Sequence, residues 1–151
     1  MNFIKGCDGS EIFKLNLYPI GFHNTDGNLW KKYGLEELTG FSEKHLFKTW
    51  CFLNRFPRMA ALASEKHPKL IIGTGINYVT DFFACFAGYD VPDIEIKSDE
   101  ITQDGSTRVY YWARLKQGTT LVVTPFLSGR YGLNSDNLLQ EMGNRISKLI
   151  A

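Results

Sequence analysis

A loop near the C-terminal end of the sequence carries the residue types best suited to holding a ligand. An apolar run at 121–123 stops at Pro125, and the following stretch holds glycines, hydrogen-bond donors and an aromatic ring: Ser128, Gly129, Arg130, Tyr131, Gly132 and Asn134. Open α/β sheets bind ligands just beyond the carboxyl end of a buried strand, and glycines allow sharp turns and close approach. The stretch predicts a binding loop, although an ordinary strand-to-helix connection has the same spacing.

A second candidate is the side chain of Asn16, near the N-terminal end. The segment 12–18 is apolar and half alternating and stops at Pro19, which predicts a buried strand with Asn16 close to its end. A buried amide must find hydrogen-bond partners, and its donor and acceptor suit the edge of a nucleobase. A capping contact to the neighbouring backbone explains the same residue equally well, so both interpretations stay open.

Other signatures of catalysis or cofactor binding are weak. The segment GTGINY at 73–78 lacks the third glycine of a dinucleotide-binding loop, which favours a tight turn. The histidines at 23, 45 and 67 form no metal-ligand or catalytic-triad pattern. We therefore expect no cofactor and no metal.

The composition indicates a folded domain. Of the 151 residues, 44% are apolar and 14% aromatic, and the net charge is +1, which disfavours disorder and a general polycationic role. Three scattered cysteines, at 7, 51 and 85, are typical of reduced thiols in a cytoplasmic protein. No apolar run is long enough to span a membrane, and no signal peptide is recognisable. We predict one cytoplasmic domain over residues 1–151 without a membrane partner.

The elements that would position the candidate residues are both helices and strands. After the strand at 12–18, strands are expected at 69–73, 93–97, 108–115 and 119–124, the last two as a hairpin around 116–118. The short apolar run at 69–73 lies between two helices, which is typical of a parallel strand. Helices are expected from Ser42, a suitable N-cap, to about residue 54, and at 57–66, 78–86 and 135–150. The first helix has a core-facing stripe: Leu46, Phe47, Trp50 and Cys51.

Three segments, in the same order, resemble the uracil-DNA glycosylase-like superfamily. They are LNLYPIGF at 15–22, NRFPRMAALASEKHPKLIIGTG at 54–75 and TLVVTPFLSGRYGLN at 120–134. The resemblance implies an α/β fold that is a three-layer α/β/α sandwich with a mainly parallel central sheet, to which this chain adds a C-terminal hairpin. Proteins of that superfamily extrude a damaged base and cleave its N-glycosidic bond, so the implied partner is DNA containing a damaged base.

The resemblance also implies roles for individual residues. Asn16 matches an asparagine that reads the pyrimidine edge. The segment 126–128 matches a loop that enters the minor groove and stabilises the charge on the departing base. Ser128 and Arg130 are then expected to contact the DNA backbone, and Tyr131 or Phe126 to stack or wedge. The full expected substrate-binding set is Asn16, Tyr18, Phe126, Ser128, Gly129, Arg130, Tyr131 and Asn134.

Two departures from the family pattern weaken the expectation of catalysis. Phe126 stands where the family carries histidine or asparagine, and a phenyl ring cannot donate a hydrogen bond to a uracil anion. The Gly-rich first motif is absent, so the chain is expected to lack an N-terminal strand and active-site loop relative to the family. We expect a base-recognising protein with weak or no glycosylase activity. The alternative is a non-catalytic protein that uses the same pocket for a small ligand or a protein partner.

The missing strand has a consequence for association. Its absence would leave unpaired backbone groups and apolar surface near Phe13, Leu15 and Leu17. We expect this edge to be covered by the N-terminal residues, by a second copy of the chain or by another protein.

Overall fold

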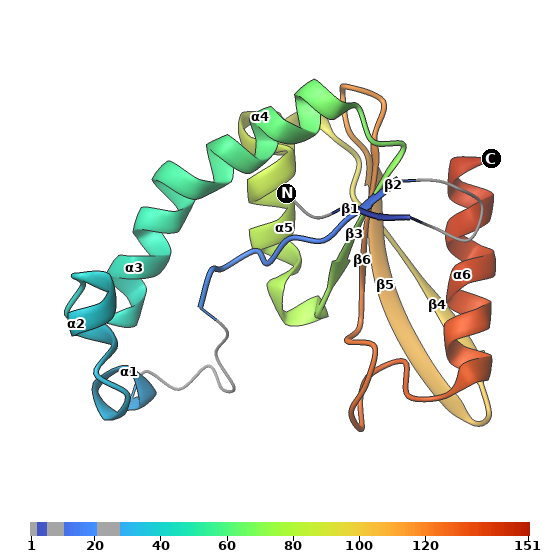
Figure 1. Ribbon diagram of the computed structural model, residues 1–151. Helices are drawn as coiled ribbons and strands as arrows, with labels where there is room; N and C mark the ends of the chain where they lie inside the picture. The colour runs from blue at the N-terminus through green and yellow to red at the C-terminus, as the bar shows by residue number, and fades with distance from the viewer. Residues whose placement is uncertain (1–2, 6–10, 21–27) are drawn as a thin grey trace. The chain divides into compact units, whose positions relative to one another are not determined.

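The computed structural model describes residues 3–5, 11–20 and 28–151, and the chain divides into two compact units, Met1–Cys51 and Phe52–Ala151 (Figure 1). Each unit is described by itself. None of the helices in the described ranges has the length and apolar character needed to cross a lipid bilayer. The single domain over residues 1–151 stays a prediction.

The first unit combines a small hairpin with short helices. In chain order its elements are β1 (Phe3–Lys5), β2 (Glu11–Phe13), α1 (Asn28–Lys32), α2 (Leu35–Thr39) and α3 (Lys44–Trp50). The two strands pair antiparallel. The core of this unit is aromatic, because Trp30 and Phe47 are buried with their ring centroids 5.4 Å apart. The Trp30 indole donates a hydrogen bond to the Phe41 carbonyl at 2.8 Å, which satisfies its polar atom.

Three predictions for this unit are wrong in part. The strand expected at 12–18 ends at Phe13, whose partner is Phe3, and no further pairing extends it within the described residues. The helix expected from Ser42 begins at Lys44 and has no side-chain cap bond. Of the expected core stripe, Phe47 and Cys51 are buried, whereas Leu46 and Trp50 are exposed. Trp50 lines an open pocket instead of a closed core.

The second unit is built on a four-stranded mixed sheet of order β3-β6-β5-β4. Its strands are β3 (Leu70–Thr74), β4 (Lys97–Gln103), β5 (Ser106–Arg114) and β6 (Thr120–Thr124). The pair β3 and β6 is parallel, and the other two pairs are antiparallel. The prediction of a mainly parallel sheet is therefore wrong, because two tight turns fold β4, β5 and β6 back on one another. The predicted C-terminal hairpin and the parallel strand near 69–73 are confirmed.

The strand predicted at 93–97 lies further along the chain. The 3₁₀ helix η3 (Gly88–Asp93) occupies the preceding residues, and β4 begins only at Lys97. The turn from β4 to β5 uses Asp104 and Gly105 with φ of 53° and 73°, the left-handed pair that favours a two-residue hairpin. The segment 97–103 is difficult to recognise as a strand, because Ile101 is its one buried residue.

Helices pack against both faces of this sheet. On one face, α6 (Asp136–Ile150) covers Tyr110 and Val122. On the other face, α5 (Val79–Phe86) places Phe83 against Leu121 and Val123. Because neighbouring residues of β6 point alternately into the two cores, every residue of that strand is buried. The strand β6 is therefore the centre of the unit.

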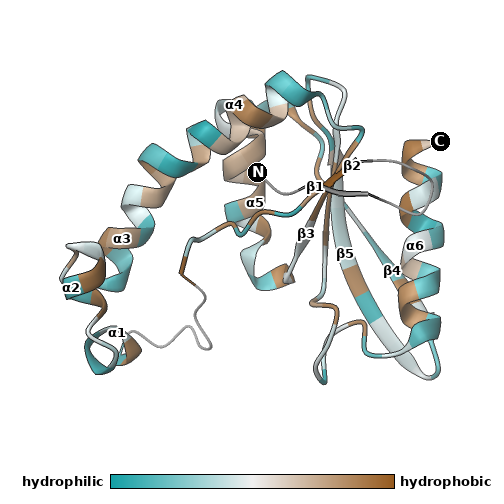
Figure 2. Ribbon diagram, in the orientation of Figure 1, coloured by the Kyte–Doolittle hydropathy of each residue, from teal (hydrophilic) through white to brown (hydrophobic). Residues whose placement is uncertain are grey.

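The remaining helices largely follow the sequence pattern. The π-helical turn η1 (Cys51–Arg55) precedes α4 (Phe56–Lys66), which has Pro57 in its first turn as predicted. At the start of α6, Ser135 is the N-cap, because its hydroxyl accepts a hydrogen bond from the Leu138 N–H at 3.2 Å. Figure 2 shows hydrophobic and hydrophilic residues alternating along α6, as in a helix with one face on a core.

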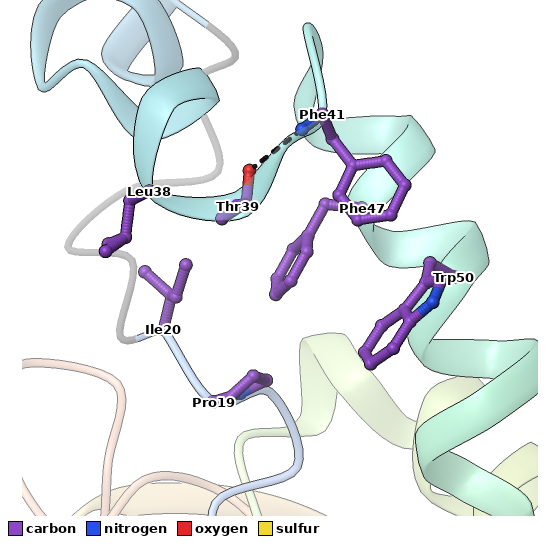
Figure 3. Close-up of a pocket in the computed structure, with 7 residues that line it drawn as sticks. All are labelled: Pro19, Ile20, Leu38, Thr39, Phe41, Phe47 and Trp50. Atoms are coloured by element: carbon purple, nitrogen blue, oxygen red, sulfur yellow. Dashed lines mark hydrogen bonds between the residues drawn. The ribbon is translucent and has the colours of Figure 1, made fainter.

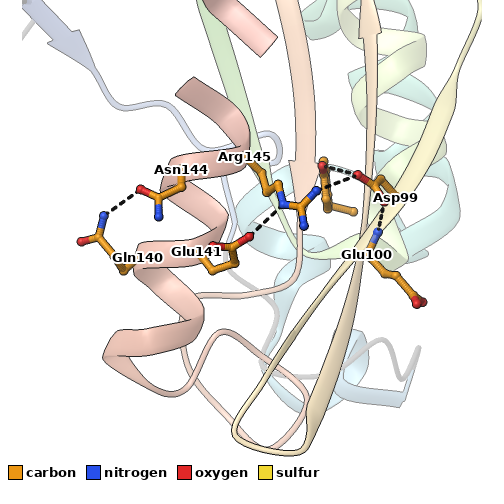
Figure 4. Close-up of polar contacts among 7 residues, drawn as sticks. Asp99, Glu100, Gln140, Glu141, Asn144 and Arg145 are labelled. Atoms are coloured by element: carbon orange, nitrogen blue, oxygen red, sulfur yellow. Dashed lines mark hydrogen bonds and ion pairs between the residues drawn. The ribbon is translucent and has the colours of Figure 1, made fainter. Parts of the chain in front are cut away.

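A polar network joins α6 to the β4–β5 hairpin (Figure 4). Arg145 contacts Glu141 at 2.8 Å and Asp99 at 3.8 Å, and the Tyr110 hydroxyl donates to Asp99 at 3.0 Å. Burial and the hydrogen bond to Asp99 raise the pKa of Tyr110 to about 12. The Glu100 backbone N–H and the Tyr110 hydroxyl hold the pKa of Asp99 below its ordinary value. The network therefore favours a neutral phenol beside an ionised carboxylate.

Candidate functional site

Two loops leave the sheet side by side at the carboxyl ends of the parallel strands β3 and β6. The first begins at Gly75 and leads into η2 (Ile76–Tyr78), and the second is residues 125–134. The Gly75 N–H donates a hydrogen bond to the Thr124 carbonyl at 2.7 Å. The Phe126 ring covers Gly75 so closely that a Cβ at Gly75, which has φ of 106°, would lie 2.6 Å from it. Glycine is therefore required there.

Residues 125–134 form a closed loop rather than an extended connection. The Leu133 N–H donates to the Phe126 carbonyl at 2.7 Å, and the Gly132 N–H donates to the Gly129 carbonyl at 3.0 Å. Gly129 has φ of 87°. A Cβ on Gly132 would lie 2.5 Å from the Phe126 carbonyl oxygen, so a side chain there would open the loop. Leu133 is buried in the core beneath α6 and anchors the end of the loop.

Most side chains between Phe126 and Tyr131 face solvent. Phe126 is 49% exposed and Tyr131 77% exposed, and Leu127, Ser128, Arg130 and Asn134 are exposed as well. The Arg130 guanidinium lies 5.6 Å from the centroid of the Tyr131 ring, within the range of a cation–π contact. The loop therefore presents apolar, aromatic and cationic groups together, which can stack on a flat ring and attract an anion.

Ser128 does not have the surroundings of a nucleophile. Among the described residues it forms no hydrogen bond with a histidine or a carboxylate. A serine hydroxyl needs such a base to be activated. Ser128 is therefore suited to donating a hydrogen bond to a bound ligand or to accepting one from it.

Sequence reasoning did not single out Arg108 of β5. Its guanidinium donates hydrogen bonds to two carbonyls of the loop, those of Gly132 at 2.7 Å and Arg130 at 3.1 Å. No local pattern marks such a residue, because the two carbonyls follow it in the sequence by more than twenty positions. Arg108 is the first residue of the strand expected at 108–115, and the Asp104–Gly105 dipeptide shortly before it is a hairpin signal.

The other two predicted site residues belong to the first unit. Asn16 is exposed and follows the end of β2 by three residues, so the prediction of an amide at the end of a buried strand is wrong. Tyr18 is half-buried, with the Lys48 ammonium 5.2 Å from its ring centroid. The eight predicted residues thus fall into two sets, the pair Asn16 and Tyr18 and the loop residues of 125–134.

An apolar pocket of about 490 Å³ lies in the first unit (Figure 3). Its lining residues are Pro19, Ile20, Leu38, Thr39, Phe41, Phe47 and Trp50. The single hydroxyl in this lining is occupied, because Thr39 donates to the Leu35 carbonyl at 2.6 Å and accepts from the Phe41 N–H at 3.2 Å. The pocket therefore offers a ligand aromatic and aliphatic contacts, and it is large enough for a small molecule.

The described residues hold no group of three or more His, Cys, Asp or Glu side chains arranged to bind a metal ion. Cys51 and Cys85 are buried cysteines, and burial raises the pKa of the Cys85 thiol to about 12. Cys7 and His23 lie outside the described residues. The buried Cys85 is a packing residue rather than a reactive one.

Comparisons with known proteins find no match: no protein-family model, no curated protein and no solved structure matches this chain.

Proposed function

We propose that this protein recognises nucleic-acid bases as a member of the uracil-DNA glycosylase-like superfamily, with weak or no glycosylase activity. The observation that carries the proposal is the exposed ring of Tyr131 with the Arg130 guanidinium beside it. An exposed aromatic ring gives an unpaired base a stacking surface, and an adjacent arginine gives a phosphate a charged donor. The position of the loop, beyond the carboxyl end of β6, is where open α/β sheets bind ligands.

The closed conformation of the loop supports binding. Its two backbone hydrogen bonds and the buried Leu133 hold residues 126–133 in one arrangement. A loop that is ordered before binding loses less conformational entropy when a ligand arrives. The exposed side chains can therefore contribute most of their contact energy to affinity.

The surroundings of Phe126 favour binding over catalysis. The resemblance places a hydrogen-bond donor at this position, where charge develops on the departing base. Here the phenyl ring packs on Gly75 and has no group that can stabilise an anion. Helices on both faces of the sheet support the three-layer arrangement that the resemblance implies.

A binding assay with a matched control tests the proposal. We expect fluorescence anisotropy to show binding of a short single-stranded DNA containing one uracil. Tyr131→Ala should weaken this binding by about 1–3 kcal/mol, the contribution of one stacked base. Tyr89→Ala is the control, because Tyr89 is fully exposed on η3 and its loss should leave affinity unchanged. Equal losses in both variants, or no binding by the intact chain, would contradict the proposal.

A cleavage assay on the same DNA tests the weak or absent glycosylase activity. Alkali treatment converts an abasic site to a strand break, so any base removal is visible as a shorter product. We expect little or no product from the intact chain. Cleavage that disappears in Asn16→Ala would show an active enzyme and would overturn our account of Phe126.

The apolar pocket of the first unit favours one alternative, a non-catalytic protein that binds a small apolar ligand. Its lining includes Phe47 and Trp50 and leaves no free hydroxyl. A ligand there would quench or shift the fluorescence of Trp50, which is partly exposed. Titration with a planar hydrophobic dye, compared between the intact chain and Trp50→Leu, would separate this function from DNA binding.

A further inference from the structure

We infer that Arg108 sets the conformation of loop 125–134 and thereby presents Arg130 and Tyr131 to a nucleic-acid strand. The inference rests on the proposed function of that loop. Arg108 itself is half-buried and is turned toward the loop backbone, so it acts through the loop and not through direct contact with a ligand.

The unequal lengths of β5 and β6 place Arg108 beside the loop. Their antiparallel register runs from Arg114 opposite Thr120 to Tyr111 opposite Val123. The strand β6 ends one residue later, whereas β5 extends back to Ser106. The first half of β5 therefore extends beyond the end of β6 (Figure 1). There it lies beside loop 125–134, which follows β6 in the chain.

Three hydrogen bonds occupy the guanidinium of Arg108. Its Nε donates to the Gly132 carbonyl at 2.7 Å and its Nη2 to the Arg130 carbonyl at 3.1 Å. Its Nη1 donates to the carbonyl of Thr107, on its own strand, at 2.9 Å. Hydrogen bonds from a charged donor are about twice as strong as neutral ones. The planar guanidinium of Arg108 thus hydrogen-bonds two peptide groups of the loop to β5.

The two anchored carbonyls lie on either side of Tyr131. The peptide bond is planar, with its C=O and N–H pointing in opposite directions. Because the Arg130 carbonyl points to Arg108, the Tyr131 N–H of the same peptide points away from β5. The peptide that follows Gly132 is fixed by the second bond. Arg108 therefore orients the backbone that carries both Arg130 and Tyr131.

The same strand supplies a matched control. Arg114 also donates to two carbonyls, those of Gly118 and Leu149, both at 3.3 Å. These acceptors belong to the β5–β6 turn and to the end of α6, not to loop 125–134. Replacing Arg114 removes the same kind of bond from the same strand and leaves the loop intact.

The first experiment measures hydrogen–deuterium exchange of the full chain without DNA. Arg108→Ala should speed exchange of the Gly132 and Leu133 amides, whose hydrogen bonds close the loop. Arg108→Lys keeps the charge but lacks the fork that reaches two carbonyls, so it should expose the same amides. Arg114→Ala should leave them protected. Unchanged protection in both Arg108 variants would overturn the inference.

The second experiment is a double-mutant cycle on binding of the uracil-containing single strand. If Arg108 acts through Arg130 and Tyr131, Arg108→Ala should weaken binding about tenfold in the intact chain and less than about twofold when both of those loop residues are already alanine. A purely structural loss would weaken binding equally in both backgrounds, and that result would overturn the inference. If the intact chain binds no DNA, the proposed function fails, while the exchange experiment still decides whether Arg108 sets the loop.

Discussion

At the scale of single residues, the surroundings of each side chain decide what it can do. Under the proposed family resemblance, Phe126 takes the place of a hydrogen-bonding residue, and its ring covers Gly75. Ser128 is exposed and has no base beside it in the described chain. Tyr131 and Arg130 are exposed and adjacent. This combination supports the proposal of a binding surface more than it supports a catalytic centre.

Tyr110 provides a pH-dependent test of the core contacts. Its pKa is raised to about 12, above the ordinary value of about 10 for tyrosine. A raised pKa stabilises the fold below the unfolded value, and this contribution is lost as the pH rises through the folded value. We expect the urea-unfolding free energy to fall between about pH 10 and pH 12, more steeply in the intact chain than in Tyr110→Phe.

At neutral pH the intact chain should have a higher unfolding free energy than Tyr110→Phe. Tyr110→Phe loses the hydrogen bond to Asp99, which should cost about 1 kcal/mol of unfolding free energy. The difference in unfolding free energy between the two proteins should then become smaller as the pH rises above about 10, the ordinary pKa of tyrosine. A gap that stays constant across this range would show that the phenol of Tyr110 does not titrate as its surroundings indicate.

At the scale of elements, local chemistry sets the ends of α6 and the turns of the hairpins. Ser135 caps the helix with a hydrogen bond to Leu138, and Asp104–Gly105 supply the left-handed turn between β4 and β5. These two ends fix where loop 125–134 stops and where β5 starts. Since Arg108 follows that turn closely, the turn also determines which residue of β5 meets the loop.

The cap of α6 should be measurable as stability. Ser135→Ala should lower the unfolding free energy by about 1 kcal/mol, because the Leu138 N–H loses its acceptor. Ser147→Ala is the control within the same helix, since its hydroxyl donates only to the Gly143 carbonyl at an exposed position. Chemical denaturation of both variants makes the comparison. Equal losses would argue against a specific capping role for Ser135.

At the scale of the whole molecule, β6 is the most completely buried strand of the second unit. This strand contributes Leu121 and Val123 to the core under α5, and Val122 to the core under α6. The same strand ends at the candidate loop, so the proposed binding surface directly follows a strand whose residues are all buried.

Replacing one buried residue of β6 tests this arrangement. Leu121 is fully buried, and Leu121→Ala should lower the unfolding free energy by about 2–5 kcal/mol through lost contacts and the cavity left behind. Leu127 is 57% exposed in the loop, so Leu127→Ala should stay within about 0.5 kcal/mol of the intact chain. Thermal and urea unfolding would compare them, and a small effect of Leu121→Ala would show that β6 is not the centre of this core.

The sequence by itself determined the elements that depend on neighbouring residues. The strand expected at 119–124, its hairpin with the preceding strand, the helix expected at 135–150 and the loop before it all follow from apolar runs, turn residues and helical periodicity. The same reasoning placed the six loop residues of the expected site in one exposed segment. These features could be predicted because the forces that create them act over a few residues.

Only the tertiary structure decided how distant segments meet. Three features depend on residues far apart in the chain. They are the antiparallel pairing within the sheet, the contact of Phe126 with Gly75, and the hydrogen bonds from Arg108 to the loop. The pairing of β2 with β1 also ends at Phe13. Asn16 therefore lies outside the strand and is exposed. Pairing and packing of this kind depend on the complementarity of whole surfaces. A local sequence pattern does not specify which of these surfaces pack together.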